Sequence, residues 1–194
     1  MCKQLHKVKF VPLESRPFSN NDIEVSVTLP SVTTRPSVSA TKKKITLTKK
    51  NNRNQLVCHR TDGTTEISNI GPSLPHHDLA HFVVEKHLGL TGGFFGNVAR
   101  GYSMVELADR EVIQSLGAES WIAEIITRSL GSLSTGACTP EQFSELVDTE
   151  LALMSIPEVA DLTANVATDM LSHFNELHAQ YLALGEGATM ELEF

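Results

Sequence analysis

Two histidines and a glutamate recur at four-residue intervals in the middle of the chain: His77, His81 and Glu85. In a helix this spacing places the three side chains along one side, because each step of four residues drifts by only about 40°. Two neutral imidazoles and a carboxylate are ligands that Zn²⁺, Fe²⁺ or Mn²⁺ can take from a protein, with room left for water or substrate. The spacing therefore predicts a divalent-metal site, with zinc as the first candidate and iron or manganese as alternatives.

The residue after the first histidine, Asp78, gives this segment the pattern His-Asp-x-x-His. It differs from the metal-binding HExxH helix by an aspartate, which is one methylene shorter and holds a general base farther from a metal-bound water. Asp78 is the candidate catalytic residue, either as a short-armed base or as a group that orients a ligand imidazole. The motif also resembles that of a zinc-containing family of ubiquinone-biosynthesis proteins, in which a glutamate follows the second histidine further along the chain. The corresponding residues here, 91–95, include no carboxylate.

Further ligands would have to come from other helices. His178 lies near the apolar side of the last predicted helix and is the fourth predicted metal ligand, although a histidine on the flank of an apolar stripe can also be purely structural. Glu124 stands three residues after Trp121 and is kept in reserve, because the pattern allows it to point inward or outward. A structural role is also open for the whole histidine segment, since buried imidazoles are ordinarily hydrogen-bonded and Glu85 could be the partner of one of them.

Capping signals and hydrophobic periodicity predict an α+β protein. The chain is expected to form an N-terminal antiparallel β-hairpin or small sheet packed on a C-terminal bundle of about five α-helices. The predicted strands are residues 44–48, 55–59 and 64–67, and the predicted helices are 75–88, 103–116, 118–130, 140–154 and 155–184. Residues 41–194 would make one domain, preceded by residues 1–40 as an extended arm rich in Ser, Thr and Pro, or as edge strands.

A glycine-rich segment follows the histidine helix. Residues 89–97 hold four glycines and the adjacent Phe94 and Phe95. Their spacing is not that of a phosphate-binding loop. The segment is either a mobile cover with an apolar lid, or a helix C-cap and turn whose phenylalanines anchor it in the core, and we favour the second interpretation.

Charge and cysteine use narrow the class of protein. Residues 1–60 carry 12 Lys and Arg against 3 Asp and Glu, whereas residues 61–194 carry 4 against 20. The basic segment lacks interleaved aromatics and the remainder is acidic, so we expect no nucleic-acid partner. Cys2, Cys58 and Cys138 form no CxxC pair, which is typical of a reducing compartment. No apolar run approaches the roughly 20 residues of a membrane span, and we expect a cytosolic protein.

Two functions remain. In the first, a metalloprotein uses His77, His81 and Glu85 to hold a metal that activates water for hydrolysis or binds an oxygen-bearing organic substrate, with Asp78 as base or orienting group. In the second, the chain is a non-catalytic helical module with structural histidines, which docks a protein partner or pairs with a second copy of itself as a homodimer. Stoichiometric metal in the isolated protein would discriminate between them.

Overall fold

The computed structural model describes residues 44–51, 53–60 and 62–194. The arm or edge strands expected in residues 1–40 lie outside these residues. The described part confirms the α+β class, because an antiparallel sheet is followed by helices.

The sheet has four strands in the order β3-β2-β1-β4, and every neighbouring pair is antiparallel. The strands are β1 (Lys44–Thr48), β2 (Asn54–His59), β3 (Thr65–Ile70) and β4 (Thr189–Glu193). Ile45 and Leu47 alternate with outward residues on β1, and they lie opposite Leu192 and Met190 of β4. This alternation buries one face of the sheet, as a strand with a period of two requires.

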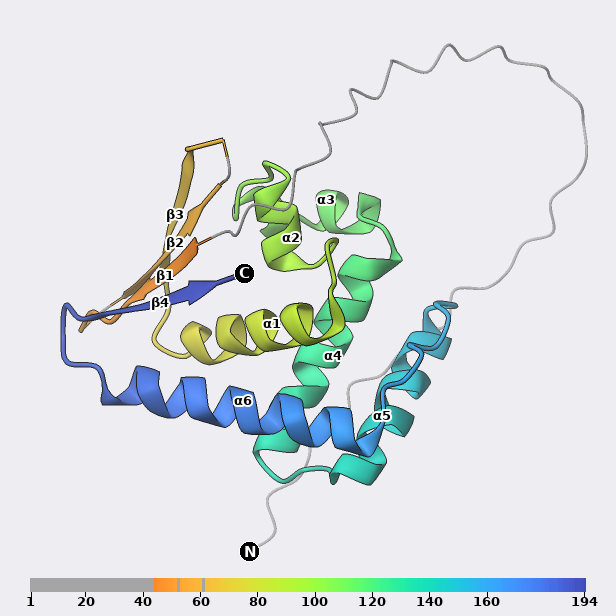
Figure 1. The fold of residues 1–194 in the computed structure, drawn as a ribbon. Helices are drawn as coiled ribbons and strands as arrows, with labels where there is room; N and C mark the ends of the chain where they lie inside the picture. The colour runs from red at the N-terminus through yellow and green to blue at the C-terminus, as the bar shows by residue number, and fades with distance from the viewer. Residues whose placement is uncertain (1–43, 52, 61) are drawn as a thin grey trace, which may run out of the picture. The chain divides into compact units, whose positions relative to one another are not determined.

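The helices cover that buried face. They are α1 (Leu74–Leu88), α2 (Phe94–Ala99), a 3-10 helix η1 (Glu106–Ala108), α3 (Arg110–Ser115), α4 (Ala118–Ser134), α5 (Pro140–Leu153) and α6 (Ala164–Ala183). Figure 1 shows α1 in the middle, with the sheet on one side and α4 and α6 on the others. No helix in the described ranges is long and apolar enough to cross a membrane.

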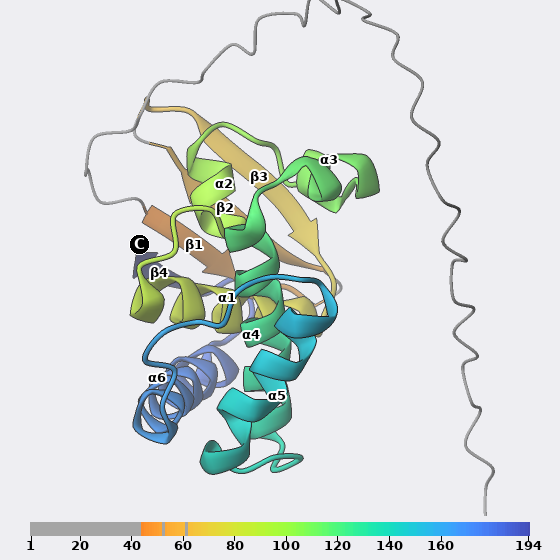
Figure 2. The ribbon, with the colours of Figure 1, turned by 90° about the vertical axis from the view of Figure 1, so that its right-hand side faces the viewer.

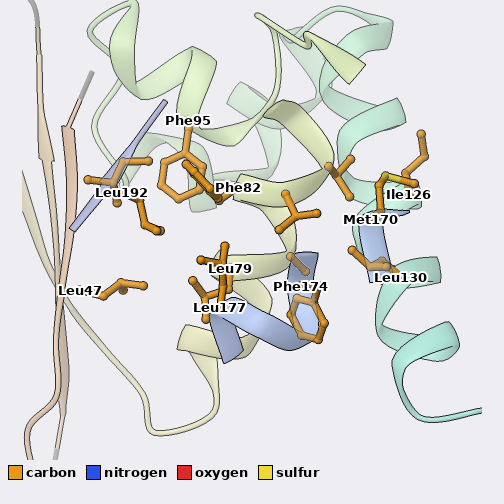
Figure 3. Close-up of a cluster of buried hydrophobic side chains, with 14 of the residues drawn as sticks. Leu47, Leu79, Phe82, Phe95, Ile126, Leu130, Met170, Phe174, Leu177 and Leu192 are labelled. Atoms are coloured by element: carbon orange, nitrogen blue, oxygen red, sulfur yellow. The ribbon is translucent and has the colours of Figure 1, made fainter. Parts of the chain in front are cut away.

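The core joins the sheet to the helices through α1. Figure 3 shows Leu47 and Leu192 from the sheet in the same cluster as Phe82 of α1 and Leu177 of α6. Every residue of α1 from 79 to 85 is buried, so apolar side chains surround this helix on nearly all sides. The predicted burial of the histidine helix between other elements is therefore confirmed. It ends as predicted at Gly89, whose φ of 64° is the left-handed conformation that favours glycine.

The single helix predicted for residues 103–116 is wrong. The capping box between Ser103 and Glu106 does form, with the Ser103 N–H donating to a Glu106 carboxylate oxygen at 2.7 Å, but it opens only the short η1. The chain then becomes extended at Asp109, whose carboxylate accepts hydrogen bonds from the N–H groups of Glu111 and Val112 and starts α3. An aspartate that can cap the next turn competes with continuation of the helix.

Two further differences lie near the C-terminus. The last helix begins at Ala164 and not at residue 155, because Ser155 and Asp161 adopt positive φ angles of 57° and 63° and interrupt the helical path. Strand β4 was not predicted, since its five residues follow a Gly-rich turn and show only two buried positions. The capping box predicted at Thr139 and Gln142 does open α5.

Candidate metal centre

Helix α1 brings the residues of the predicted site to one buried region. His81 and Asp78 are almost fully buried, and Glu85 is only 1% exposed. The imidazoles of His77 and His81 lie edge to face, with ring centroids 4.7 Å apart. The spacing of four residues thus places the two histidines next to each other, as expected for one helix face.

The carboxylate that meets both histidines belongs to Glu124 on the neighbouring helix α4. Its Oε2 lies 3.1 Å from His81 Nε2 and 3.7 Å from His77 Nε2. One ligand atom from each of the three residues lies within 4.8 Å of the others. In a tetrahedral zinc site with bonds of about 2.0–2.1 Å, neighbouring ligand atoms are about 3.3 Å apart. The cluster is therefore close to the size that a bound metal would need.

Glu85 lies on the other side of the His81 ring, away from this cluster. Its Oε1 accepts a hydrogen bond from His81 Nδ1–H at 3.2 Å, and its two oxygens also accept from the backbone N–H groups of Phe95 and Gly96 at 3.3 and 3.2 Å. The structure thus places this predicted ligand where it orients His81 and caps the start of α2. A carboxylate that receives Nδ1–H leaves Nε2 free to face a metal.

The glycine-rich segment explains how α2 approaches so closely. A Cβ on Gly93 would overlap the Glu85 carboxyl group, so only glycine fits beside this side chain. Phe95 is buried in the core, as the interpretation of an anchored turn expects, and Phe94 is partly buried. The glycines therefore serve the packing of Glu85, which in turn holds His81.

Replacing Gly93 with alanine is expected to lower the free energy of unfolding by about 1–3 kcal/mol, because the added methyl displaces a carboxylate fixed by three hydrogen bonds. Gly131→Ala is the matched control. It lies in α4 with open space at its Cβ position, and it should stabilise the protein by about 0.5–1 kcal/mol. Urea unfolding of both variants measures the difference, and equal effects would contradict this role for Gly93.

Burial and hydrogen bonding shift the pKa values of His77, Asp78, His81 and Glu124 in different directions. Burial would lower the pKa of His81, but its hydrogen bonds to Glu124 and Glu85 raise the pKa to about 9. Burial lowers the pKa of His77, and the hydrogen bond from His81 lowers that of Glu124. Burial raises the pKa of Asp78 to about 7. Without metal, His81 is thus a cation between two carboxylates, while His77 is a neutral imidazole with an available lone pair.

A cavity of about 740 Å³ opens beside the cluster and is lined by His77, Asp78, His81 and Glu124. The Asp78 carboxyl group forms no hydrogen bond with a described residue, and its Oδ2 is fully buried. This volume lies in the range of small-molecule sites. The three-residue cluster therefore borders a space in which a water or a substrate can reach it.

The remaining sequence candidate, His178, lies elsewhere. Its ring stacks on Phe174 and meets the edge of His76, with centroids 5.6 and 4.8 Å away. Glu124, for which the sequence pattern allowed an inward or an outward position, is the residue that lies beside His77 and His81. Its signal is visible in retrospect, because Trp121, Glu124 and Arg128 follow a helical spacing of three and four residues and all line the cavity.

Comparison of the chain with models of protein families, with curated proteins and with solved structures gave no match. The site must therefore be interpreted from its own geometry.

Proposed function

We propose that this protein binds a divalent metal ion, with zinc as the first candidate, through His77, His81 and Glu124. The observation that carries the proposal is the convergence of three ligand atoms within 4.8 Å at the edge of a cavity. Two histidines and one glutamate are the protein ligands of a class of catalytic zinc sites, in which the fourth position takes water or substrate. Iron and manganese accept the same ligand types and remain alternatives.

The proposed reaction is hydrolysis of a small substrate in the cavity. A bound metal would supply a Lewis acid that polarises a substrate oxygen and lowers the pKa of water. Asp78 would take the proton of the attacking water and return it to the leaving group, so that no net proton is consumed in that exchange. Burial supports this role because it raises the pKa of Asp78 to about 7. A group with such a pKa can both accept and donate a proton near neutral pH. Asp78 forms no hydrogen bond with the imidazole of His77 or His81 in the structure. This favours the role of a base over that of a group that orients a ligand imidazole.

Zinc titration of the chelator-treated protein against a chromophoric competitor tests the proposal. We expect about one zinc per chain, and Glu124→Gln should weaken binding by about 100-fold or more, because an amide is a poor replacement for an anionic ligand. His178→Ala is the control, since it removes a histidine outside the cluster, and it should change the affinity by less than about twofold.

A second function is supported by the hydrogen bonding of His81, which is complete without a metal because both ring nitrogens face carboxylates. In this alternative the histidines are structural and the protein is a non-catalytic binding or oligomerisation module. Failure of wild-type protein to bind zinc, iron(II) or manganese(II) would overturn the metal proposal in its favour.

A further inference from the structure

The cavity continues well beyond the metal cluster, and its other lining residues bear on what it can hold. Much of this lining is apolar and comes from residues 104–116, around η1 and α3, and from Trp121 of α4. Figure 2 shows α3 leading into the start of α4. The apolar side chains of this part are Met104, Leu107, Ala108, Ile113, Leu116 and Trp121. Such a wall suits the apolar body of an organic molecule, because its side chains offer few hydrogen-bonding groups.

The cavity carries basic as well as acidic side chains, although the surrounding chain is mostly acidic. Residues 61–194 contain only four Lys and Arg residues, and two of them, Arg110 and Arg128, line this cavity. Both are exposed, which places them at its opening. Arg128 is held by Glu124 and by Glu150, at 3.7 and 2.9 Å. No other described side chain pairs with Arg110.

Arg110 therefore presents an uncompensated guanidinium group beside an apolar wall. The nearest acidic neighbour before it in sequence, Asp109, is already engaged in capping α3. A guanidinium group binds carboxylates through two parallel hydrogen bonds, so it suits a ligand with one anionic oxygen pair. The 20 acidic residues of the same region repel ligands that carry several negative charges.

We propose that the cavity binds an organic monocarboxylate with an apolar body, with the carboxylate at Arg110 and the body against Trp121 and the apolar wall. This inference deepens the proposed function. It rests on that function in one respect, because the end of the ligand away from its carboxylate would lie at the proposed metal ligands His77, His81 and Glu124. Binding of the anion itself needs no metal, which makes it testable separately.

The test uses the fluorescence of Trp121, the only tryptophan of the chain, which lies in the cavity wall. Metal-free protein in excess EDTA is titrated with octanoate and, in parallel, with octan-1-ol, which has the same chain without the charge. We expect octanoate to change the emission and to bind about tenfold more tightly than the alcohol, and Arg110→Gln should remove that preference. Lys50→Gln removes the same charge at an exposed site outside the cavity and should leave the preference intact.

Three results would overturn the inference: no response to octanoate, equal binding of acid and alcohol in the wild type, or an unchanged preference in Arg110→Gln. Because EDTA is present throughout, none of them bears on zinc binding. Conversely, a wild-type protein that binds octanoate through Arg110 but takes no zinc would retain the ligand class and lose the metal centre.

Discussion

Glu85→Ala is expected to lower the free energy of unfolding of the metal-free protein by about 3–5 kcal/mol, the range for removing one partner of a buried ion pair. Glu85 is 1% exposed and accepts hydrogen bonds from the His81 ring and from the N–H groups of Phe95 and Gly96. Alanine would leave these buried donors without an acceptor and would also open a gap. The loss should far exceed that of a surface glutamate.

Urea unfolding in EDTA measures this effect, with Glu176→Ala as the control, because Glu176 is exposed on α6 and, among the described residues, accepts a hydrogen bond only from Gln180. The control should cost less than about 0.5 kcal/mol. Glu85→Gln keeps the shape and one oxygen acceptor, so it should fall between the two. If Glu85→Ala were as mild as the control, these hydrogen bonds would not be what fixes His81.

The fold class and most elements could be predicted because their signals are local. Caps and turn residues identified the start of α5 and the end of α1, and alternating apolar residues identified β1 and β2. The errors arose where local signals compete. Asp109 caps α3 inside what a capping box predicts as one helix, and β4 is stabilised by its pairing with β1, which lies about 140 residues away in sequence.

The candidate site could be predicted only as far as it lies on one helix. The interval of four residues correctly placed His77 beside His81 and Glu85 beside His81. It did not reveal that the Glu85 carboxylate lies at Nδ1 of His81, while Nε2 of the same ring faces helix α4. That depends on the packing of α1 against α4, which no local spacing encodes, and it decides that Glu124 joins the metal-sized cluster. His178 shares a helix face with core residues, yet its position along α6 places it beside His76.

Asp78→Asn is expected to gain stability over the wild type as pH rises. In the metal-free protein, the free energy of unfolding of Asp78→Asn minus that of the wild type should increase by about 2–4 kcal/mol from pH 4 to pH 8. Burial raises the pKa of the folded-state Asp78 from its ordinary value of 3.8 to about 7. The folded chain thus keeps a proton that the unfolded chain has lost, so the stability of the wild type falls as pH rises from about 4 to 7. Asparagine does not ionise and avoids this loss.

The measurement is urea unfolding of both proteins in EDTA at several pH values from 4 to 8, with the difference in free energy as the readout. His81 also contributes a pH dependence, because its raised pKa gives stability that is complete below about 6.5 and lost as pH approaches 9. This contribution is present in both proteins and largely cancels in the difference. Asp169→Asn, at an exposed position of α6, is the control and should give a difference that does not grow across this range. A constant difference for Asp78→Asn would show that this carboxyl group ionises freely in the fold, and Asp78 would then lack the pKa that makes it a base near neutral pH.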